Sequence, residues 1–488
     1  MRFAQTVTLL SLAAGALEAQ QPPALARLVS IHSAVVAFAA AHPDALWPGF
    51  RPETIPVLYV VPGQGTLLLG WPDSAPPAGF GPLAGVPHAG WQPVAARGAA
   101  STGTTLGGRG TAQVFVFPDA DEALLFGTTI HEAFHVFERG VARDDRKFGS
   151  GENAFLVSTY PVFDPVNEAG WALEGRLLAR ALDARAPAER IERAREFVAA
   201  REARHRAIGA DLADFEGMAE LNEGLAEYAL VRSLELAAGD AAFPWRQDAA
   251  REVAHHRARL DSLTADVRQS LRLRFYATGP AIGQLLDRLA GPDWKRRLVA
   301  GDLTMQDELA EASGYRDVER ALRSRAARAV DTAALGRSAR EGVERMRAIR
   351  RVQVDSVLAR PGVTVVLRAD SLPGARFGLC GIDPQNLLQV DRSVLLHTRW
   401  VRPCAGGLSA EFTTAAVQDR ARGTFSGVVG PQDSVRLSAG GKPVTLGEGE
   451  TASVADFKLE SPGLNVSAGK AVLARRGGVI EVTPQTGR

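Results

Sequence analysis

The sequence predicts an α+β protein in which a mostly helical domain with a small amino-terminal sheet precedes a β-rich carboxy-terminal domain. Residues 168–350 are dominated by Ala, Leu, Glu and Arg, which favour helices. After residue 351 the chain changes to short β-branched runs punctuated by Gly, Pro, Asp and Ser, which is typical of strands joined by turns. The length of 488 residues is sufficient for roughly two to four domains.

Composition and charge place the chain among folded globular proteins. Apolar residues make up 46% and charged residues 23%, both close to the averages for soluble domains. The 56 Lys and Arg residues balance 55 Asp and Glu residues, which leaves a formal charge of +1. A nucleic-acid-binding protein needs a net basic face, so we expect no nucleic-acid partner.

Residues 1–19 have the pattern of a cleavable signal peptide. Arg2 precedes an apolar run from Val7 to Leu17, and Ala19 offers a small residue at the cleavage site. The run is shorter than the ~20 residues that cross a bilayer, and no later stretch is apolar enough to do so. We therefore expect an exported protein, periplasmic or extracellular, without a membrane span.

The first, mostly helical domain is predicted to cover residues 20–350. Residues 112–117 favour a strand, and Asp119 or Asp121 can cap a following helix that runs to about Glu138. Residues 71–110 are rich in Gly and Pro and are predicted to be largely loop. The later helices are expected to break near Pro187, Gly209, Pro244 and Gly291. Within the loop region, residues 103–110 allow two interpretations, an edge strand that pairs with a substrate backbone or a plain flexible loop.

Residues 351–488 are predicted to form a β-sandwich-like domain, with the boundary near residue 350. Val352 and Val354 mark its first strand-like run, and similar runs recur to the end of the chain. Cys380 and Cys404 are the two cysteines of the sequence. In an exported protein we expect them to form a disulfide.

A zinc-binding motif lies at residues 131–135, which read H-E-A-F-H. On a helix, His131 and His135 lie on one face, so both imidazoles can bind one zinc ion. Glu132 is then placed to take a proton from a water that the zinc activates, and to return it to the leaving amine. The motif predicts one Zn²⁺ per chain.

A catalytic zinc needs a third protein ligand, and no other histidine follows at the spacing of known zinc motifs. His255 and His256 lie in an Arg-rich helix and are predicted to be surface residues. The third ligand is therefore expected to be a carboxylate on another helix. Four residues are candidates: Glu223, Glu174, Glu216 and Glu220.

Residues 220–228 read E-L-N-E-G-L-A-E-Y, and together with H-E-x-x-H they resemble the gluzincin metallopeptidases, most closely the aminopeptidase N-like branch. The resemblance implies a thermolysin-like catalytic domain that hydrolyses peptide bonds in peptides or proteins, with Glu223 as the third zinc ligand. Gly224 would let its helix approach the metal closely. Glu227 would orient His131 from behind.

A second resemblance to that branch lies downstream, where Tyr276 and Gly279 match a Y-x-x-G pattern. It implies that the Tyr276 phenol stabilises the oxyanion of the transition state. Two features depart from the family: Glu223 follows His135 by 88 residues, which inserts residues 136–215, and the G-x-M-E-N motif that binds a free amino terminus is missing. Aminopeptidase specificity is therefore not predicted.

We interpret the sequence as that of an exported zinc metallopeptidase. One alternative is a non-catalytic zinc-binding secreted protein whose β domain binds a partner. Another is a hydrolase that uses the same zinc-activated water on a non-peptide bond. The sequence does not distinguish endopeptidase from exopeptidase action, the preferred side chains or the oligomeric state.

Overall fold

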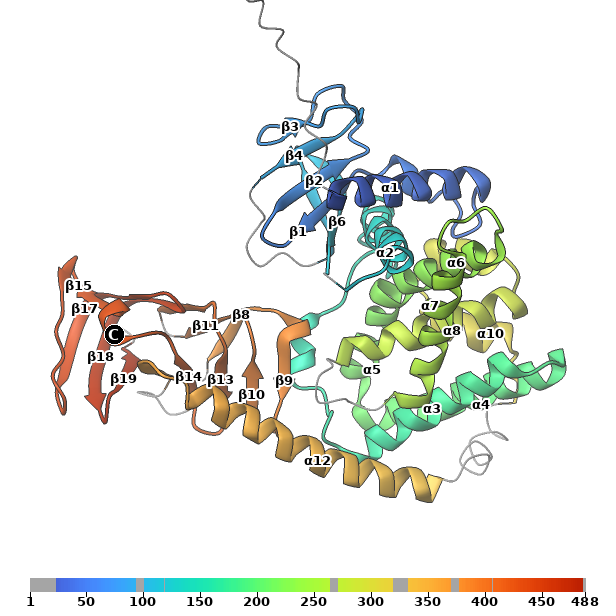
Figure 1. Ribbon diagram of the computed structural model, residues 1–488. Coiled ribbons are helices and arrows are strands. Elements are labelled where there is room, and N and C mark those ends of the chain that lie inside the picture. The colour runs from blue at the N-terminus through green and yellow to red at the C-terminus, as the bar shows by residue number, and fades with distance from the viewer. Residues whose placement is uncertain are drawn as a thin grey trace, which may run out of the picture.

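The protein consists of a mostly helical body with a small sheet at one end and an elongated β-rich domain, as the computed structural model shows (Figure 1). This confirms the α+β class. The structure describes residues 23–93, 101–117, 119–263, 271–318, 332–369, 377–405 and 407–485. The predicted signal peptide lies outside these residues and stays a prediction. Among the described helices, none is long and apolar enough to cross a membrane.

The amino-terminal sheet has six strands in the order β3-β4-β2-β1-β6-β5, and β1 and β6 are its parallel pair. Helix α1 (Pro23–Ala41) and the 3₁₀ turn η1 (Pro52–Thr54) pack beside it. The strands are β1 (Val57–Val61), β2 (Gly65–Leu69), β3 (Gly81–Pro82), β4 (Gly90–Gln92), β5 (Thr102–Leu106) and β6 (Arg109–Phe115). Residues 71–110, expected to be mostly loop, thus contain three short strands, and β5 is an edge strand.

Helix α2 (Glu122–Val141) follows β6 and carries the H-E-x-x-H motif. Asp121 caps it, because its side chain accepts a hydrogen bond from the Leu124 backbone N–H at 2.8 Å. Phe126, Ile130 and Phe134 recur at a spacing of four residues and are fully buried. They fix the rotation of the helix, so the neighbouring motif histidines face the later helices.

The remaining helices of the body follow the predicted breaks. They are α3 (Pro165–Asp183), α4 (Pro187–Ile208), α5 (Ala210–Ala219), α6 (Leu225–Gly239), α7 (Arg246–Ala258), α8 (Phe275–Leu289), α9 (Asp293–Ala300) and α10 (Met305–Ala312). The shorter turns are η2 (Ala154–Ser158), η4 (Arg259–Ser262) and η5 (Leu271–Arg274). A π-helical turn, η3 (Glu220–Gly224), joins α5 to α6. The long insertion between the two motifs therefore folds mainly as α3 and α4.

The β domain is one connected sheet of thirteen strands that folds over itself. The first half of β18 pairs with β12 and the second half with β19, so this strand belongs to both layers. The bounds are β7 (Thr364–Arg368), β8 (Gly378–Ile382), β9 (Leu387–Gln389), β10 (Val394–His397), β11 (Val401–Ala405), β12 (Leu408–Phe412), β13 (Ala416–Asp419), β14 (Thr424–Val428), β15 (Arg436–Ala439), β16 (Lys442–Pro443), β17 (Thr451–Ser461), β18 (Leu464–Arg476) and β19 (Val479–Pro484), with 3₁₀ turns η7 (Pro384–Asn386) and η8 (Gln432–Ser434).

Helix α12 (Thr332–Leu358) connects the two parts and runs past the predicted boundary at residue 350. The prediction that Val352 and Val354 begin a strand is wrong, because both lie in this helix. Val357 and Val354 lie three residues apart and pack against an apolar cluster of the β domain. This contact extends the helix where local β propensity favoured a strand.

The β domain is docked firmly on the helical body. The Gln389 side chain on β9 donates a hydrogen bond to the Val157 carbonyl at 3.0 Å, and Arg350 of α12 donates to the Gln389 carbonyl. Leu387 and Leu395 belong to the same buried apolar cluster as the core of the body. Figure 1 shows β9 at the end of the β domain that adjoins the helical body, with β15 and β17 at the opposite end of that domain.

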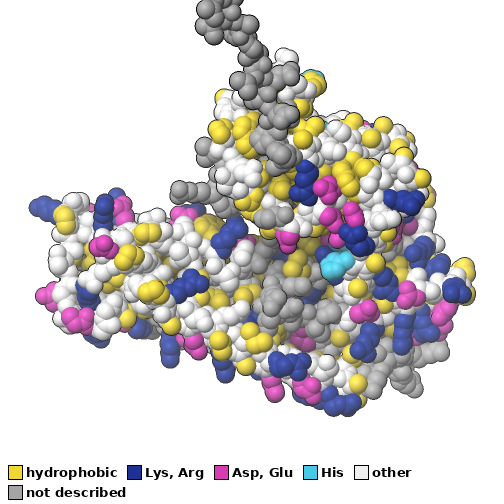
Figure 2. Space-filling view, viewed as in Figure 1, with side chains coloured by type: hydrophobic (Ala, Val, Ile, Leu, Met, Phe, Trp, Pro, Cys, Tyr) yellow, Lys and Arg dark blue, Asp and Glu magenta, His cyan; other side chains and the backbone are white. Residues whose placement is uncertain are grey.

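The predicted disulfide is present between Cys380 and Cys404, with a Cα–Cα distance of 5.9 Å. It joins β8 to β11 in a branch of the sheet that packs over the main core. Over the face of the molecule in Figure 2, basic and acidic side chains are interspersed on both parts of the protein. This mixing agrees with the near-zero formal charge.

We predict that His397 makes the protein less stable in mild acid. It is fully buried on β10, its Nδ1 atom has no hydrogen-bond partner in the structure, and burial lowers its pKa from 6.5 to about 4. Between these values the unfolded chain binds a proton that the folded chain does not, so the free energy of unfolding falls as the pH is lowered. The contribution is about 2 kcal/mol between pH 7.5 and pH 5.

Urea unfolding of the parent and of His397→Gln at both pH values measures this difference. The glutamine keeps a donor toward Gln418, which lies 3.2 Å from His397 Nε2. The variant should lose less stability in acid than the parent. An equal loss in the two proteins would show that His397 is not the neutral, buried group described above.

Candidate metal centre

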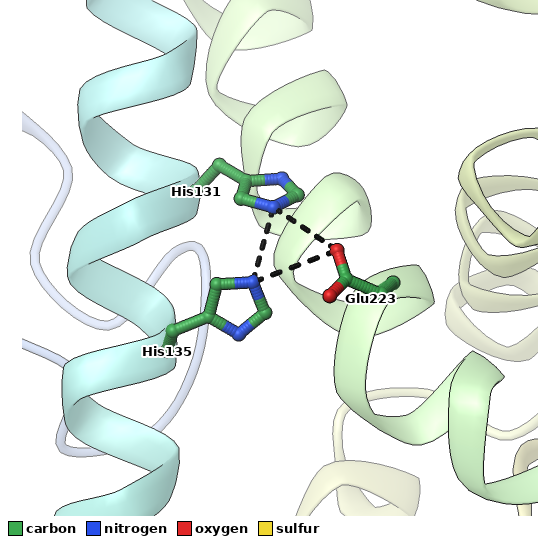
Figure 3. A group of neighbouring side chains, drawn as sticks. All are labelled: His131, His135 and Glu223. Carbon is green, nitrogen blue, oxygen red and sulfur yellow. Dashed lines mark hydrogen bonds and ion pairs between the residues drawn. The ribbon is translucent and has the colours of Figure 1, made fainter. Parts of the chain in front are cut away.

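Helix α2 places the two motif histidines side by side. Their Nε2 atoms lie 3.1 Å apart, and both point away from the helix toward η3 (Figure 3). His131 is buried and His135 is nearly so. This is the arrangement that the i, i+4 spacing predicts for two ligands of one ion.

Glu223 of η3 completes the group from the opposite side. Its Oε2 atom lies 3.7 Å from Nε2 of His131 and 3.7 Å from Nε2 of His135. Ligand atoms about 2.1 Å from a tetrahedral zinc ion lie about 3.4 Å from one another. The three distances in this group are close to that value, so the donor set fits one ion of this size.

Two further carboxylates hold the histidines from behind. Glu227, one turn beyond Glu223, lies 2.9 Å from Nδ1 of His131, the contact that the family resemblance implies for it. Glu138 lies 3.2 Å from Nδ1 of His135. Both imidazoles therefore present Nε2 to the site. The sequence analysis did not assign Glu138, although its position three residues after His135 on the same helix face was a usable signal.

The site has an excess of negative charge. Burial opposes protonation of His131, but hydrogen bonds with Glu223 and Glu227 outweigh this effect and raise the pKa of His131 to about 9. Burial opposes ionisation of Glu223, but Arg272 and the two histidines hold its pKa well below the usual range. More carboxylates than arginines surround the imidazoles, and a divalent cation neutralises such a surplus.

Glu132 lies at the site with one carboxylate oxygen uncommitted. The side chain is 5% exposed, and its Oε2 atom has no hydrogen-bond partner among the residues that the structure describes. Burial raises the pKa of this carboxyl, although the adjacent histidines oppose the shift. A carboxylate with a raised pKa and an oxygen without a partner is suited to accept a proton.

Tyr276 and Arg272 both contact Glu223. The Tyr276 hydroxyl donates to Oε2, the oxygen that faces the histidines, at 2.5 Å, and Arg272 donates to Oε1. Arg272 also pairs with Glu152 at 2.7 Å. Burial and the Glu223 charge raise the pKa of Tyr276 well above its usual value, so the phenol stays a donor. The sequence predicted Tyr276 as a residue of the site. It did not predict Arg272, because no local pattern marks this residue.

Two glycine contacts bring α8 against η3 and α6. A Cβ atom on Gly279 would lie 2.2 Å from the Gly224 Cα, and one on Gly283 would lie 2.4 Å from the Tyr228 ring. The expectation that Gly224 allows approach to the metal is therefore corrected, because Gly224 allows the approach of α8. This close contact places Tyr276, at the start of α8, on Glu223.

The other three candidate ligands are engaged elsewhere. Arg201 pairs with Glu174 at 2.8 Å and with Glu220 at 2.7 Å, and Arg204 pairs with Glu216 and Glu174. All five side chains are buried. Of the four candidates, Glu223 is the one that the structure brings to the motif histidines.

The prediction that His256 is a surface residue is wrong. Its side chain is 5% exposed, and its Nδ1 atom lies 3.3 Å from Oε1 of Glu227. Arg259 contacts the same oxygen at 3.1 Å. Helix α7 packs against α6, so a sequence that looked like a solvated Arg-rich helix has one buried face. His256 therefore lies beside Glu227, which in turn contacts His131.

The candidate centre opens into a cavity of about 900 Å³. Thr102 and Gly103 of the edge strand β5 line it, as do Phe115 and Phe117. Residues 103–110 are therefore not a plain loop, because they belong to β5, β6 and the turn between them, and pairing of β5 with a substrate backbone stays a prediction. Residues of the β domain also line the cavity: Pro384, Asn386 and Arg399. Both parts of the protein therefore line the cavity.

Comparisons of the chain with protein-family profiles, curated proteins and solved structures gave no match. The resemblance to gluzincins consequently depends on the residues of the two motifs and their geometry. The fold and the centre define a protein with a buried two-histidine, one-carboxylate group at the base of a large cavity. The activity belongs to the proposal below.

We predict that Gly279→Ala disturbs the centre. Its methyl group would overlap the Gly224 backbone, so α8 must move away and carry Tyr276 from Glu223. We expect a loss of about 1–3 kcal/mol in the free energy of unfolding and weaker zinc binding. Gly140→Ala is the matched control, since a Cβ there meets nothing within 4 Å and should be neutral or stabilising. Unchanged stability and zinc affinity in Gly279→Ala would contradict the role of the contact.

We also predict that Glu138→Gln and Glu227→Gln each raise the zinc dissociation constant about 10- to 100-fold, because each removes the charged partner of a ligand histidine. Competition with a chromogenic chelator measures this constant. Glu189→Gln, on the exposed side of α4, is the control and should bind zinc like the parent. Equal zinc affinities of the parent and the three variants would mean that Glu138 and Glu227 do not support the histidines.

Proposed function

We propose that the protein is an exported zinc-dependent metallopeptidase of the gluzincin type, with a thermolysin-like catalytic domain. One observation carries this proposal: His131, His135 and Glu223 meet at the base of a large cavity that also contains the uncommitted oxygen of Glu132. Two imidazoles and one carboxylate are a common ligand set of catalytic zinc in hydrolases. One zinc ion per chain is the implied cofactor.

The proposed chemistry divides between the metal and the chain. Zinc held by the three ligands would act as a Lewis acid and lower the pKa of a water to near neutrality. Glu132 takes the proton of the attacking water on its free oxygen and passes it to the leaving amine. Burial raises the pKa of Glu132, which supports this role, because a more basic carboxylate accepts a proton more readily.

Tyr276 and β5 are proposed to act on the substrate. The phenol of Tyr276 stays protonated, and its position against the metal-facing oxygen of Glu223 supports donation to the oxyanion that develops beside the metal. The free edge of β5 lines the same cavity and offers backbone groups to an extended peptide. A peptide or protein substrate is therefore favoured over a small ester.

The main alternative is a non-catalytic zinc protein with a partner-binding β domain. Structural zinc sites use four protein ligands and are closed to solvent. The group found among the described residues has three ligands and opens on the cavity. Residues of the β domain line that cavity as well, which gives this domain a place in the cleft. These observations favour catalysis.

We predict that Glu132→Gln retains zinc and loses peptide hydrolysis by at least about 1,000-fold, because the base is removed while the ligands stay. Elemental analysis of the purified protein and cleavage of a broad peptide library measure the two quantities. His131→Ala and Glu223→Ala should lose the metal, and the exposed-site variant Glu189→Gln should keep both properties.

Three results would contradict the proposal in different ways. A parent protein that binds zinc but cleaves no peptide favours the non-catalytic alternative, unless an ester or epoxide panel reveals turnover. Equal hydrolysis by Glu132→Gln and the parent would remove Glu132 from the mechanism. Zinc retained in Glu223→Ala would exclude Glu223 as the third ligand.

A further inference from the structure

We propose that Arg139 forms a carboxylate-binding subsite in the cleft, so that preferred substrates present a free carboxylate beside β5. This inference rests on the proposed function, because it names the substrate class of the same site. The carboxylate has two possible sources, an acidic side chain or the carboxy terminus of the substrate. The chemistry of recognition is the same for both.

The position of Arg139 on α2 directs it into the cleft. It follows His135 by four residues, as His135 follows His131, so the three side chains form one stripe along the helix. All three line the cavity of about 900 Å³. A group bound by Arg139 therefore lies about one helical turn from the candidate metal centre.

Glycine at position 103 makes room for this guanidinium on the edge strand. A Cβ atom on Gly103 would lie 1.6 Å from an Arg139 terminal nitrogen and 3.3 Å from the His135 Cβ. A side chain on any other residue there would displace the arginine. The guanidinium thus lies against the backbone of β5 at Gly103, beside the path proposed for the substrate.

Arg139 is also the cation of the cleft that lacks an acidic partner. Four arginines line the cavity. Arg272 is neutralised by Glu152 and Glu223, Arg259 contacts Glu227, and Arg399 lies 3.6 Å from Asp383. No ion pair or hydrogen bond of Arg139 occurs among the residues that the structure describes.

None of the carboxylates that line the cavity pairs with Arg139 in the part of the chain that the structure describes. Glu138, the immediate neighbour of Arg139 in the chain, points to His135 instead, and Glu227 is held by His131 and Arg259. The planar fork of arginine matches a carboxylate with two parallel hydrogen bonds. An exposed guanidinium at the wall of a cleft, without a partner among the described residues, is suited to bind that group from a ligand.

The test compares matched peptides on the zinc-loaded full chain. One set replaces Glu by Gln at each position around the cleaved bond, and the other replaces the carboxy-terminal acid by its amide. The parent should cleave one acidic form about 10- to 100-fold better in kcat/KM than its neutral counterpart. The set that shows the preference identifies the source of the carboxylate.

Variants assign the preference to Arg139. Arg139→Gln should abolish the preference, and Arg139→Glu should reverse it toward peptides with Lys at that position. Arg143→Ala is the matched control, because Arg143 is exposed just beyond the end of α2 and does not line the cavity. Elemental analysis confirms that each variant retains its zinc and that a lost preference is not a lost metal centre.

The failures of the two proposals are distinguishable. Hydrolysis without any acid preference, or a preference that persists in Arg139→Gln, overturns the subsite and leaves the peptidase function intact. Absence of all hydrolysis by the zinc-loaded parent overturns the function. Equilibrium binding of the same peptides to the parent and Arg139→Gln then decides the subsite alone: tighter binding of the acidic form by the parent supports it, and equal binding overturns it.

Discussion

The backbone contact between Gly224 and Gly279 is the constraint on which the candidate centre depends. Helices packed through larger side chains lie 8–10 Å apart, which would leave the residues at their ends out of reach of one another. Here two glycines remove the intervening atoms, and Gly283 repeats the arrangement one turn later against Tyr228. The two sequence patterns around residues 224 and 279 are therefore two halves of one helix contact, and Tyr276 meets Glu223 because of it.

The same residue type takes different roles in this protein according to its partner. Glutamates of α3, α5 and the start of η3 face Arg201 and Arg204 and form a buried ionic network within the body. Glu223 and Glu227, within two turns of that network, face imidazoles instead. Removing one partner from either arrangement would leave a buried charge unpaired. The first group of carboxylates therefore stays with the arginines and the second with the imidazoles.

Local sequence patterns were sufficient to predict those parts of the site that lie on a single helix. The H-E-x-x-H spacing, the Asp121 cap and the breaks at Pro187 and Gly209 are all present as predicted. The contributions of Arg272 and His256 depend on which helices pack together, and a single sequence does not contain that information. The prediction of a strand at Val352 and Val354 was wrong for a related reason. Contacts between the end of α12 and the β domain stabilise a helix where the local β-branched sequence favours a strand.

The docking of the β domain determines when the cleft acquires its final shape. The candidate ligands, the proposed base Glu132 and the edge strand all precede residue 280, whereas Pro384, Asn386 and Arg399 come from the last third of the chain. During synthesis the amino-terminal body emerges first, with one wall of its cleft still missing. Pro384, Asn386 and Arg399 all lie between the two cysteines in the sequence, so the disulfide closes the loop of chain that carries them. The cavity thus acquires its last lining residues only when this part of the β domain has folded onto the body.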